Sequence, residues 1–404
     1  MANVFNFTAK LSLPKETEKF KPIEKKTFSS GWESNSVKFN AISGTNRVLV
    51  MCQGGKWSND SKNTVKTFSK STTDANGKTV KGSSIDIPWA KRFDKDQIEK
   101  VAGFKKFIVD TGDYKERYRL QDLVKAFENG AVTDDQMEEF GIETLEDAKA
   151  ALEKSQAKRR EFISEWDFVE FVTKLVSSDK YKSKLFNISG NYEVQYSADK
   201  RKFYKNYHVN RITLAADDAE PKTEMKVDFY YGEDAWDDST FDETGKVMVN
   251  GWFSYYDSNL KKQGFQNDIV VVIREENEKK RNALKKKFAV DEGIKQIGLT
   301  LSVIEGAEVI ELTMDMLDEE TREDIECGLL DWETVKKELG GRAIGDRISE
   351  LRFTELTPKK NIAQDTDYTV DDMHPAREDV AEIQDEDEDD DSSVPFDLDD
   401  DDDL

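Results

Sequence analysis

The stretch KLFNISGNYEVQYSADKRKFYKNYHVNRITLA, residues 184–215, holds two strand-like runs on either side of a polar break. Both runs are rich in Phe, Tyr, Val and Ile at alternating positions, which is typical of half-buried strands. Runs of the same character, bounded by Gly, Asn and Asp, occur at residues 5–13, 36–43, 47–52, 224–232, 246–258 and 267–274. We therefore expect a mainly β fold with two sets of short antiparallel strands, one on each side of residue 164.

Helical patterns interrupt the strands and make the expected class α+β. Residues 120–163 are rich in Ala, Glu, Leu and Lys, and LEDAKAALEKSQAKRREFI (145–163) predicts one long exposed helix. EWDFVEFVTKLV (165–176) predicts a second, more buried helix. KKRNALKKKF (279–288) follows acidic residues and predicts a helix whose charges suit its dipole.

The negative charge of the chain is concentrated at one end. Residues 361–404 contain 20 acidic residues and a single basic one, Arg377, and so carry most of the formal charge of −24. The remaining residues are close to neutral, so the overall charge does not exclude a nucleic-acid partner. A block of like charge without regular apolar spacing buries too little surface to fold, so we expect disorder there.

The segment ADKRKFYKNYHVNR, residues 198–211, mixes aromatic and basic side chains. In a strand, alternation places Arg201, Phe203, Lys205, Tyr207, Val209 and Arg211 on one face and Lys202, Tyr204, Asn206, His208 and Asn210 on the other. Single-stranded nucleic acid requires this combination, because bases stack on aromatic rings and phosphates pair with cations. The alternative is an edge strand whose rings pack inward while its lysines block further pairing.

A second basic region lies at residues 54–84, where six lysines stand against two aspartates. We expect a long hairpin that projects from the first strand set. Together with WAKRF (89–93), these patterns predict stacking and phosphate contacts. The predicted stacking residues are Trp57, Trp89, Phe203, Tyr204 and Tyr207, and the predicted phosphate contacts are Lys56, Lys66, Lys91, Arg92, Arg201, Lys202, Lys205 and Arg211.

Signatures of catalysis are scarce in the sequence. GxxxxGK[ST], HExxH, GxSxG and CxxC are all missing, so we expect no enzymatic activity, no cofactor and no metal. The acidic stretch 232–243 is expected to be a surface loop rather than a magnesium site. Cys52 and Cys327 are expected to be reduced, and with no long apolar run we expect a cytoplasmic protein without membrane contact.

The end of the chain, DEDEDDDSSVPFDLDDDDDL (385–404), carries small apolar groups among carboxylates. An acidic terminus with a Pro-Phe tip after a strand-rich body resembles the single-stranded DNA-binding proteins of bacteria and their phages, and the size and helical insertion resemble a phage-encoded form. That resemblance implies oligonucleotide-binding (OB) barrels and a tip that recruits replication and recombination proteins. The implied partner-binding residues are Val394, Pro395, Phe396, Leu398 and Leu404, although bacterial members usually end at Pro-Phe.

These observations predict tandem OB-like β-barrels joined by a helical insertion and followed by a disordered acidic tail. The expected boundaries are 1–119, 120–163, 164–275, 276–358 and 359–404, with the basic hairpin at 54–84. The expected function is binding of single-stranded DNA with little sequence preference during replication, recombination or repair. The alternatives are an acidic chaperone or DNA mimic that binds a basic protein, and a metal-dependent nuclease.

Overall fold

The computed structural model describes residues 3–73, 77–197, 202–257, 261–266, 268–273, 277–309, 314, 317–339 and 344–373. The strands of the body are β1 (Val4–Ser12), β2 (Ile23–Thr27), β3 (Trp32–Ser43), β4 (Asn46–Trp57), β9 (Phe107–Asp110), β10 (Arg159–Phe162), β11 (Leu185–Ser197), β12 (Lys202–Leu214), β13 (Lys222–Tyr231), β14 (Trp236–Asp237), β15 (Lys246–Val249), β16 (Trp252–Asp257), β17 (Lys261–Gln266), β18 (Ile269–Val272), β19 (Lys295–Val309), β20 (Ile344–Leu356) and β21 (Gln364–Asp365). The helices are α1 (Lys95–Lys100), α2 (Tyr114–Glu128), α3 (Asp134–Phe140), α4 (Leu145–Gln156), α5 (Glu165–Val176), α6 (Phe241–Thr244), α7 (Glu278–Phe288), α8 (Glu319–Glu326), α9 (Trp332–Leu339) and α10 (Val370–Met373). The expected mainly β fold with added helices is confirmed.

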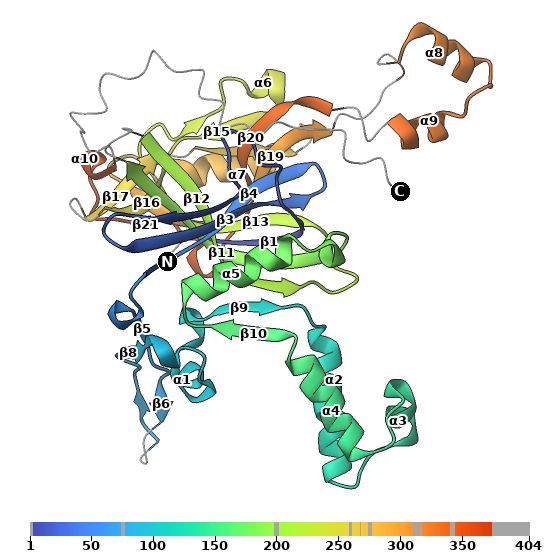
Figure 1. The fold of residues 1–404 in the computed structure, drawn as a ribbon. Helices are drawn as coiled ribbons and strands as arrows, with labels where there is room; N and C mark the ends of the chain where they lie inside the picture. The colour runs from blue at the N-terminus through green and yellow to red at the C-terminus, as the bar shows by residue number, and fades with distance from the viewer. Residues whose placement is uncertain are drawn as a thin grey trace.

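One hydrogen-bonded sheet connects both predicted strand sets. β1 pairs antiparallel with β3 of the first set and with β11 and β13 of the second, and β13 pairs in turn with β19. Across the described residues, seventeen strands belong to this sheet, shown in Figure 1. The two strand sets therefore share a core, in which Phe7, Phe39 and Phe186 are fully buried. The tandem OB-like barrels and their boundaries stay predictions.

Helix α5 covers part of this core and has the bounds predicted from the sequence. Phe168, Val169, Val172, Leu175 and Val176 are buried along one face at the spacing of an amphipathic helix. Ser164 caps the helix by accepting a hydrogen bond from the Asp167 backbone N–H. The apolar face packs on β3 and β4, so α5 braces the end of the sheet where β3 begins and β4 ends.

The helical insertion is an arm with its own small core. Leu120, Leu123 and Val124 of α2 pack against Ala148 of α4 and Ile142. The single long helix predicted for residues 145–163 is wrong, because α4 ends at Gln156 and Arg159–Phe162 form β10. Pairing of β10 with β9 and packing of Phe162 on Phe171, with ring centroids 5.4 Å apart, outweigh the local helical preference.

The basic hairpin also begins later than the sequence suggests. Residues 54–57 continue β4, and the hairpin consists of β5 (Thr64–Phe68) with β8 (Ser84–Pro88) and β6 (Thr72–Thr73) with β7 (Thr79–Val80). Val65 and Ile87 are buried against Val101 and Ile163, so this unit has a core of its own. Figure 1 shows it and the helical arm as two projections on the side of the body that carries α5.

The C-terminal end of the body is ordered further than residue 359, where disorder was predicted to begin. Residues 357–373, here called the C-terminal strap, contain η7 (Pro358–Lys360), β21 and α10. β21 pairs with β19, Tyr368 packs on Tyr230, and Met373 is 1% exposed. Tyr368 is partly buried and Met373 is buried, and so they order this segment. The many acidic residues around them had led to the prediction of disorder. Residues 374–404, which include Val394, Pro395, Phe396, Leu398 and Leu404, lie outside the described residues.

Candidate nucleic-acid interface

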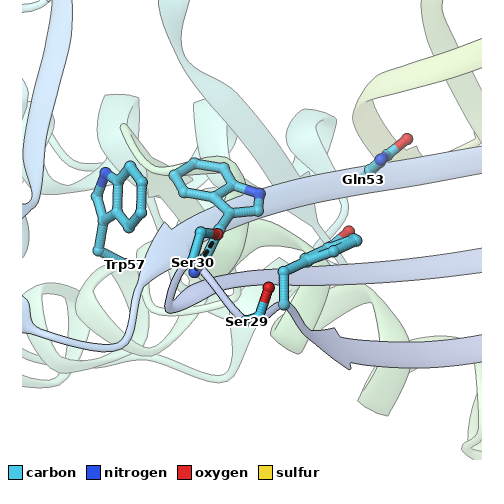
Figure 2. A pocket seen from close by; sticks show the side chains of 7 residues that line it. Ser29, Ser30, Gln53 and Trp57 are labelled. Atoms are coloured by element: carbon cyan, nitrogen blue, oxygen red, sulfur yellow. Dashed lines mark hydrogen bonds between the residues drawn. The ribbon is translucent and has the colours of Figure 1, made fainter.

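A pocket with aromatic walls lies where the β2–β3 turn meets the end of β4. Its volume is about 580 Å³, and its lining comprises Phe28, Ser29, Ser30, Trp32, Ser34, Gln53 and Trp57. Figure 2 shows Trp57 at one end of the pocket and Gln53 at the other, with Ser29 and Ser30 along one edge. Phe28 is 49% exposed and Trp32 36% exposed, so ring surface is open to solvent.

The strand register brings the two indoles together. Trp32 of β3 faces Trp57 of β4, and their ring centroids lie 5.2 Å apart in an edge-to-face arrangement. Gly31, with a φ of +84°, closes the preceding turn by donating its N–H to the Phe28 carbonyl at 2.9 Å. Asn63 fixes the Trp57 backbone by two hydrogen bonds of 2.8 Å. The backbone that carries the two rings is therefore fixed on both strands.

Two adjacent glycines in β4 leave space on opposite faces of the sheet. A Cβ at Gly54 would lie 2.6 Å from the backbone of Glu165 and Trp166, and a Cβ at Gly55 would lie 2.2 Å from the Trp32 ring. Side chains alternate along a strand, so one glycine accommodates α5 and the other accommodates the indole. This pair places the aromatic pocket directly behind the first turn of α5.

Lys56, a predicted phosphate contact, points to the α5 face rather than into the pocket. Its ammonium lies 3.6 Å from Glu33 and 5.2 Å from the centre of the Trp166 ring. On the same face, Lys25 contacts Glu170, and Asn35 donates to Glu170 at 3.2 Å. These contacts give Lys56 a structural role in holding α5. Trp57, in contrast, lines the pocket, with the Lys62 ammonium 5.5 Å from its ring centre, and its role in base stacking stays a prediction.

Arg92 and Trp89 are also used inside the protein. The Arg92 guanidinium bonds both carboxylate oxygens of Asp167 on α5, at 2.7 and 3.3 Å. It also stacks over the rings of Trp89 and Phe93, 4.0 and 4.2 Å from their centres. Trp89, at the start of η2 (Trp89–Lys91), packs on the hairpin core. The Arg92 side chain, predicted to contact phosphate, therefore forms an ion pair with Asp167 of α5.

Exposed cations and rings remain on the same projection. Lys66 of β5 and Lys91 of η2 are exposed, as phosphate contacts require. Lys105 lies between two exposed rings, 5.7 Å from the centre of Phe68 and 6.0 Å from the centre of Phe104, which is 77% exposed. The hairpin projection thus presents further exposed aromatic rings and lysines outside the pocket.

The predicted residues on β12 divide into core and surface positions. Tyr207 packs against Phe5, Phe7 and Tyr192 with ring centroids 5.1 to 5.6 Å apart, and burial raises its pKa. Its ring is packed in the core, as expected from the alternative in which the rings of this strand pack inward instead of stacking on bases. Tyr204 is 36% exposed, and Lys205 and Arg211 are exposed. Arg201 and the side chains of Lys202 and Phe203 lie outside the described residues.

Tyr204 with Lys205, and Trp57 with the hairpin residues, form two groups at opposite ends of β4, whereas Arg211 lies beside Ile108 of β9. His208 of β12 lies beside Met51 of β4, and the two strands run parallel. Tyr204 is thus near the start of β4, whereas Trp57 ends that strand. At about 3.3 Å per residue, the groups are on the order of 30 Å apart. They do not form a single compact site.

Of the seven pocket residues only Trp57 was predicted from the sequence. Phe28, Trp32 and Gln53 were not selected, although FSSGW (28–32) places two aromatics around a Ser-Gly turn. That turn could have indicated that Phe28 and Trp32 lie close together, because a tight turn brings the rings on either side of it to one side of the chain. Gln53 carried no signal, since its position opposite Ser36 depends on the pairing of β3 with β4.

The acidic stretch 232–243 is tied to neighbouring cations. Arg281 and Lys285 of α7 donate to Asp238 at 2.8 and 3.1 Å, and these hydrogen bonds lower its pKa to about 2. Within the residues that the structure describes, no group of three or more His, Cys, Asp or Glu side chains is arranged to hold a metal ion. No helix in this part of the chain is both long and apolar enough to cross a membrane.

Comparisons with known proteins give little further information. No protein-family model matches the sequence, and no curated protein matches it. Among solved structures, the chain is similar to a deletion mutant of the single-stranded DNA binding protein from Thermus aquaticus. The two share 8% sequence identity and a TM-score of 0.26, and the match covers 78% of this chain and 97% of the other. A TM-score this low does not establish a common fold.

Proposed function

We propose that this protein binds single-stranded DNA with little overall sequence preference and without catalysis. The observation that carries the proposal is the pocket of Phe28, Trp32 and Trp57, whose rings are partly open to solvent and whose other lining groups are uncharged. A site of this kind suits a neutral, planar group with polar edges. An unpaired nucleobase has that chemistry, and it is accessible in a single strand but not in a duplex.

The surroundings supply the charge that a nucleic-acid backbone needs. Lys62 lies over Trp57, and Lys66, Lys91 and Lys105 are distributed over the adjoining projection. Cations beside stacking rings can pair with phosphates on either side of a bound base. We therefore place the main DNA contact on the end of β4 and the basic hairpin, with Tyr204 of β12 as a second contact.

We further propose that residues 374–404 recruit proteins of DNA replication and recombination. Val394, Pro395, Phe396, Leu398 and Leu404 are apolar anchors within a field of carboxylates, which suits a basic, partly apolar groove on a partner. The same carboxylates would compete with DNA for the lysines of the hairpin.

Fluorescence anisotropy with a labelled dT oligonucleotide tests the DNA contact. Trp32→Ala and Trp57→Ala should each weaken binding by about 1 to 3 kcal/mol if the rings stack on bases. Tyr118→Ala is the matched control, because Tyr118 is 64% exposed on the helical arm, outside the pocket. Unchanged affinity of both Trp variants, with unfolding midpoints like that of the parent, would remove the pocket from the interface. Absence of binding by the parent would refute the function.

A further inference from the structure

Gln53 carries the one amide among the side chains that line the pocket, whose other polar side chains are serine hydroxyls. It is exposed on β4, at the opposite end of the pocket from Trp57, as Figure 2 shows. Within the described part of the chain, no hydrogen bond engages its side-chain amide, whereas Ser30 Oγ already accepts the Trp32 N–H at 3.3 Å. An uncommitted amide beside open aromatic rings is available to a ligand.

We propose that the pocket selects a single adenine base from the bound strand, with Gln53 as the specificity residue. This inference rests on the proposed binding of single-stranded DNA. The Gln53 amide would accept a hydrogen bond from the adenine N6 amino group through Oε1 and donate one to a ring nitrogen through Nε2. A strand would thus be bound without preference at most positions and with preference at one.

The shape and chemistry of the pocket favour this assignment. Gln forms paired hydrogen bonds with adenine because amide and base edge each present one donor and one acceptor side by side. The volume of about 580 Å³ has room for a two-ring purine, whose larger face gives more stacking contact with Trp32 and Phe28 than a pyrimidine gives. The lining contains no cation or carboxylate that would favour a phosphate or an amine instead.

The test uses the full chain and dT oligonucleotides of one length that carry a single central dA, dC or dG, compared with the all-dT strand. The parent should bind the dA strand at least about 5-fold more tightly than the all-dT strand, as expected for one paired contact. Gln53→Leu should abolish that ratio, because it removes the amide but keeps most of the side-chain bulk.

Gln121→Leu, on α2 of the helical arm, is the matched control and should keep the dA preference. Gln53→Ala provides a second variant with the same expected loss, so that a local effect of leucine cannot explain the result. Equal affinity of the parent for all four strands would overturn adenine selection and leave DNA binding intact. A dA preference that survives in both Gln53 variants would overturn the role of Gln53. Failure of the parent to bind any strand would overturn the proposed function itself.

Discussion

Tyr204 and Tyr207 lie three residues apart on β12 and have different environments. We expect Tyr204→Ala to weaken binding of dT oligonucleotides by about 1 to 3 kcal/mol, because its partly exposed ring is free to stack on a base. Tyr207→Ala should instead lower the free energy of unfolding by about 3 kcal/mol, since it removes a ring packed on Phe5, Phe7 and Tyr192. Anisotropy and urea unfolding of both variants measure the two effects. A stable Tyr207→Ala protein with weakened binding would reverse this assignment.

Asp110, at the base of the helical arm, is only 4% exposed and accepts two hydrogen bonds of 2.8 Å from Arg117. Hydrogen bonding to Asp110 raises the pKa of Arg117 despite partial burial. Asp110→Ala leaves this guanidinium without its main partner, so we expect a loss of about 3 kcal/mol in unfolding free energy. Glu139→Ala, which breaks the exposed pair with Arg119 on the same arm, should cost less than about 1 kcal/mol. Equal losses in urea unfolding would contradict this difference.

Among the elements, the C-terminal strap is expected to lose stability at low pH through Asp228 of β13. Burial would raise the pKa of Asp228, but hydrogen bonds, including those from Lys360 at 2.7 and 2.8 Å, lower it overall. A carboxyl whose folded pKa is depressed stabilises the fold above its unfolded pKa, near 3.9, and loses that contribution as the pH falls toward the folded value.

Lys360→Met should therefore lower the unfolding free energy by about 1.5 to 3 kcal/mol at neutral pH, and the difference from the parent should shrink below about pH 4. Urea unfolding from pH 7 to pH 3 measures this difference. Asp228→Asn combined with Lys360→Met should recover part of the loss, because no charge is then left buried. A difference that is constant over this pH range would show that the ion pair does not stabilise the strap.

The elements also show where sequence reasoning succeeds. Helix α5 has the bounds predicted from its apolar spacing, residues 165–176, because the Ser164 cap and the burial of its apolar face favour the same helix. The helix predicted over 145–163 failed at β10, since pairing with β9 is a long-range contact that local composition does not reveal. The strap was missed for a similar reason: Tyr368 and Met373 find partners on distant strands, and the acidic residues around them dominated the pattern.

At the scale of the whole molecule, the length of the acidic tail matters for any truncation. Residues 374–404 contain 16 acidic residues and one arginine. A chain ending at residue 373 keeps the strap and should bind dT oligonucleotides more tightly than the full chain, most strongly at low salt, because carboxylates no longer compete for the lysines. Anisotropy titrations at two salt concentrations measure this. Equal affinities at low salt would show that the tail does not contact the DNA surface.

A chain ending at residue 360 differs, because it removes β21, Tyr368 and Met373 from the body. Its lower stability would obscure any gain in DNA affinity. Trp57 was predicted to stack on bases, and Lys66 and Lys91 to contact phosphates. Trp57 lines the pocket and both lysines are exposed, so these roles stay predictions. The same mixture of aromatic and basic residues surrounds Arg92, Lys56 and Tyr207 in the sequence. Only their contacts with α5 and β1 in the structure show that these side chains stabilise the fold.

The glycine pair at positions 54 and 55 has a consequence for how this protein can vary over evolutionary time. An alanine at 54 would press against helix backbone, which cannot yield without displacing α5, whereas an alanine at 55 would press against a surface indole that can rotate. Substitution of Gly54 would thus destabilise the fold, whereas substitution of Gly55 would narrow the pocket. Two neighbouring positions of identical residue type would therefore diverge at different rates, one governed by folding and the other by the ligand.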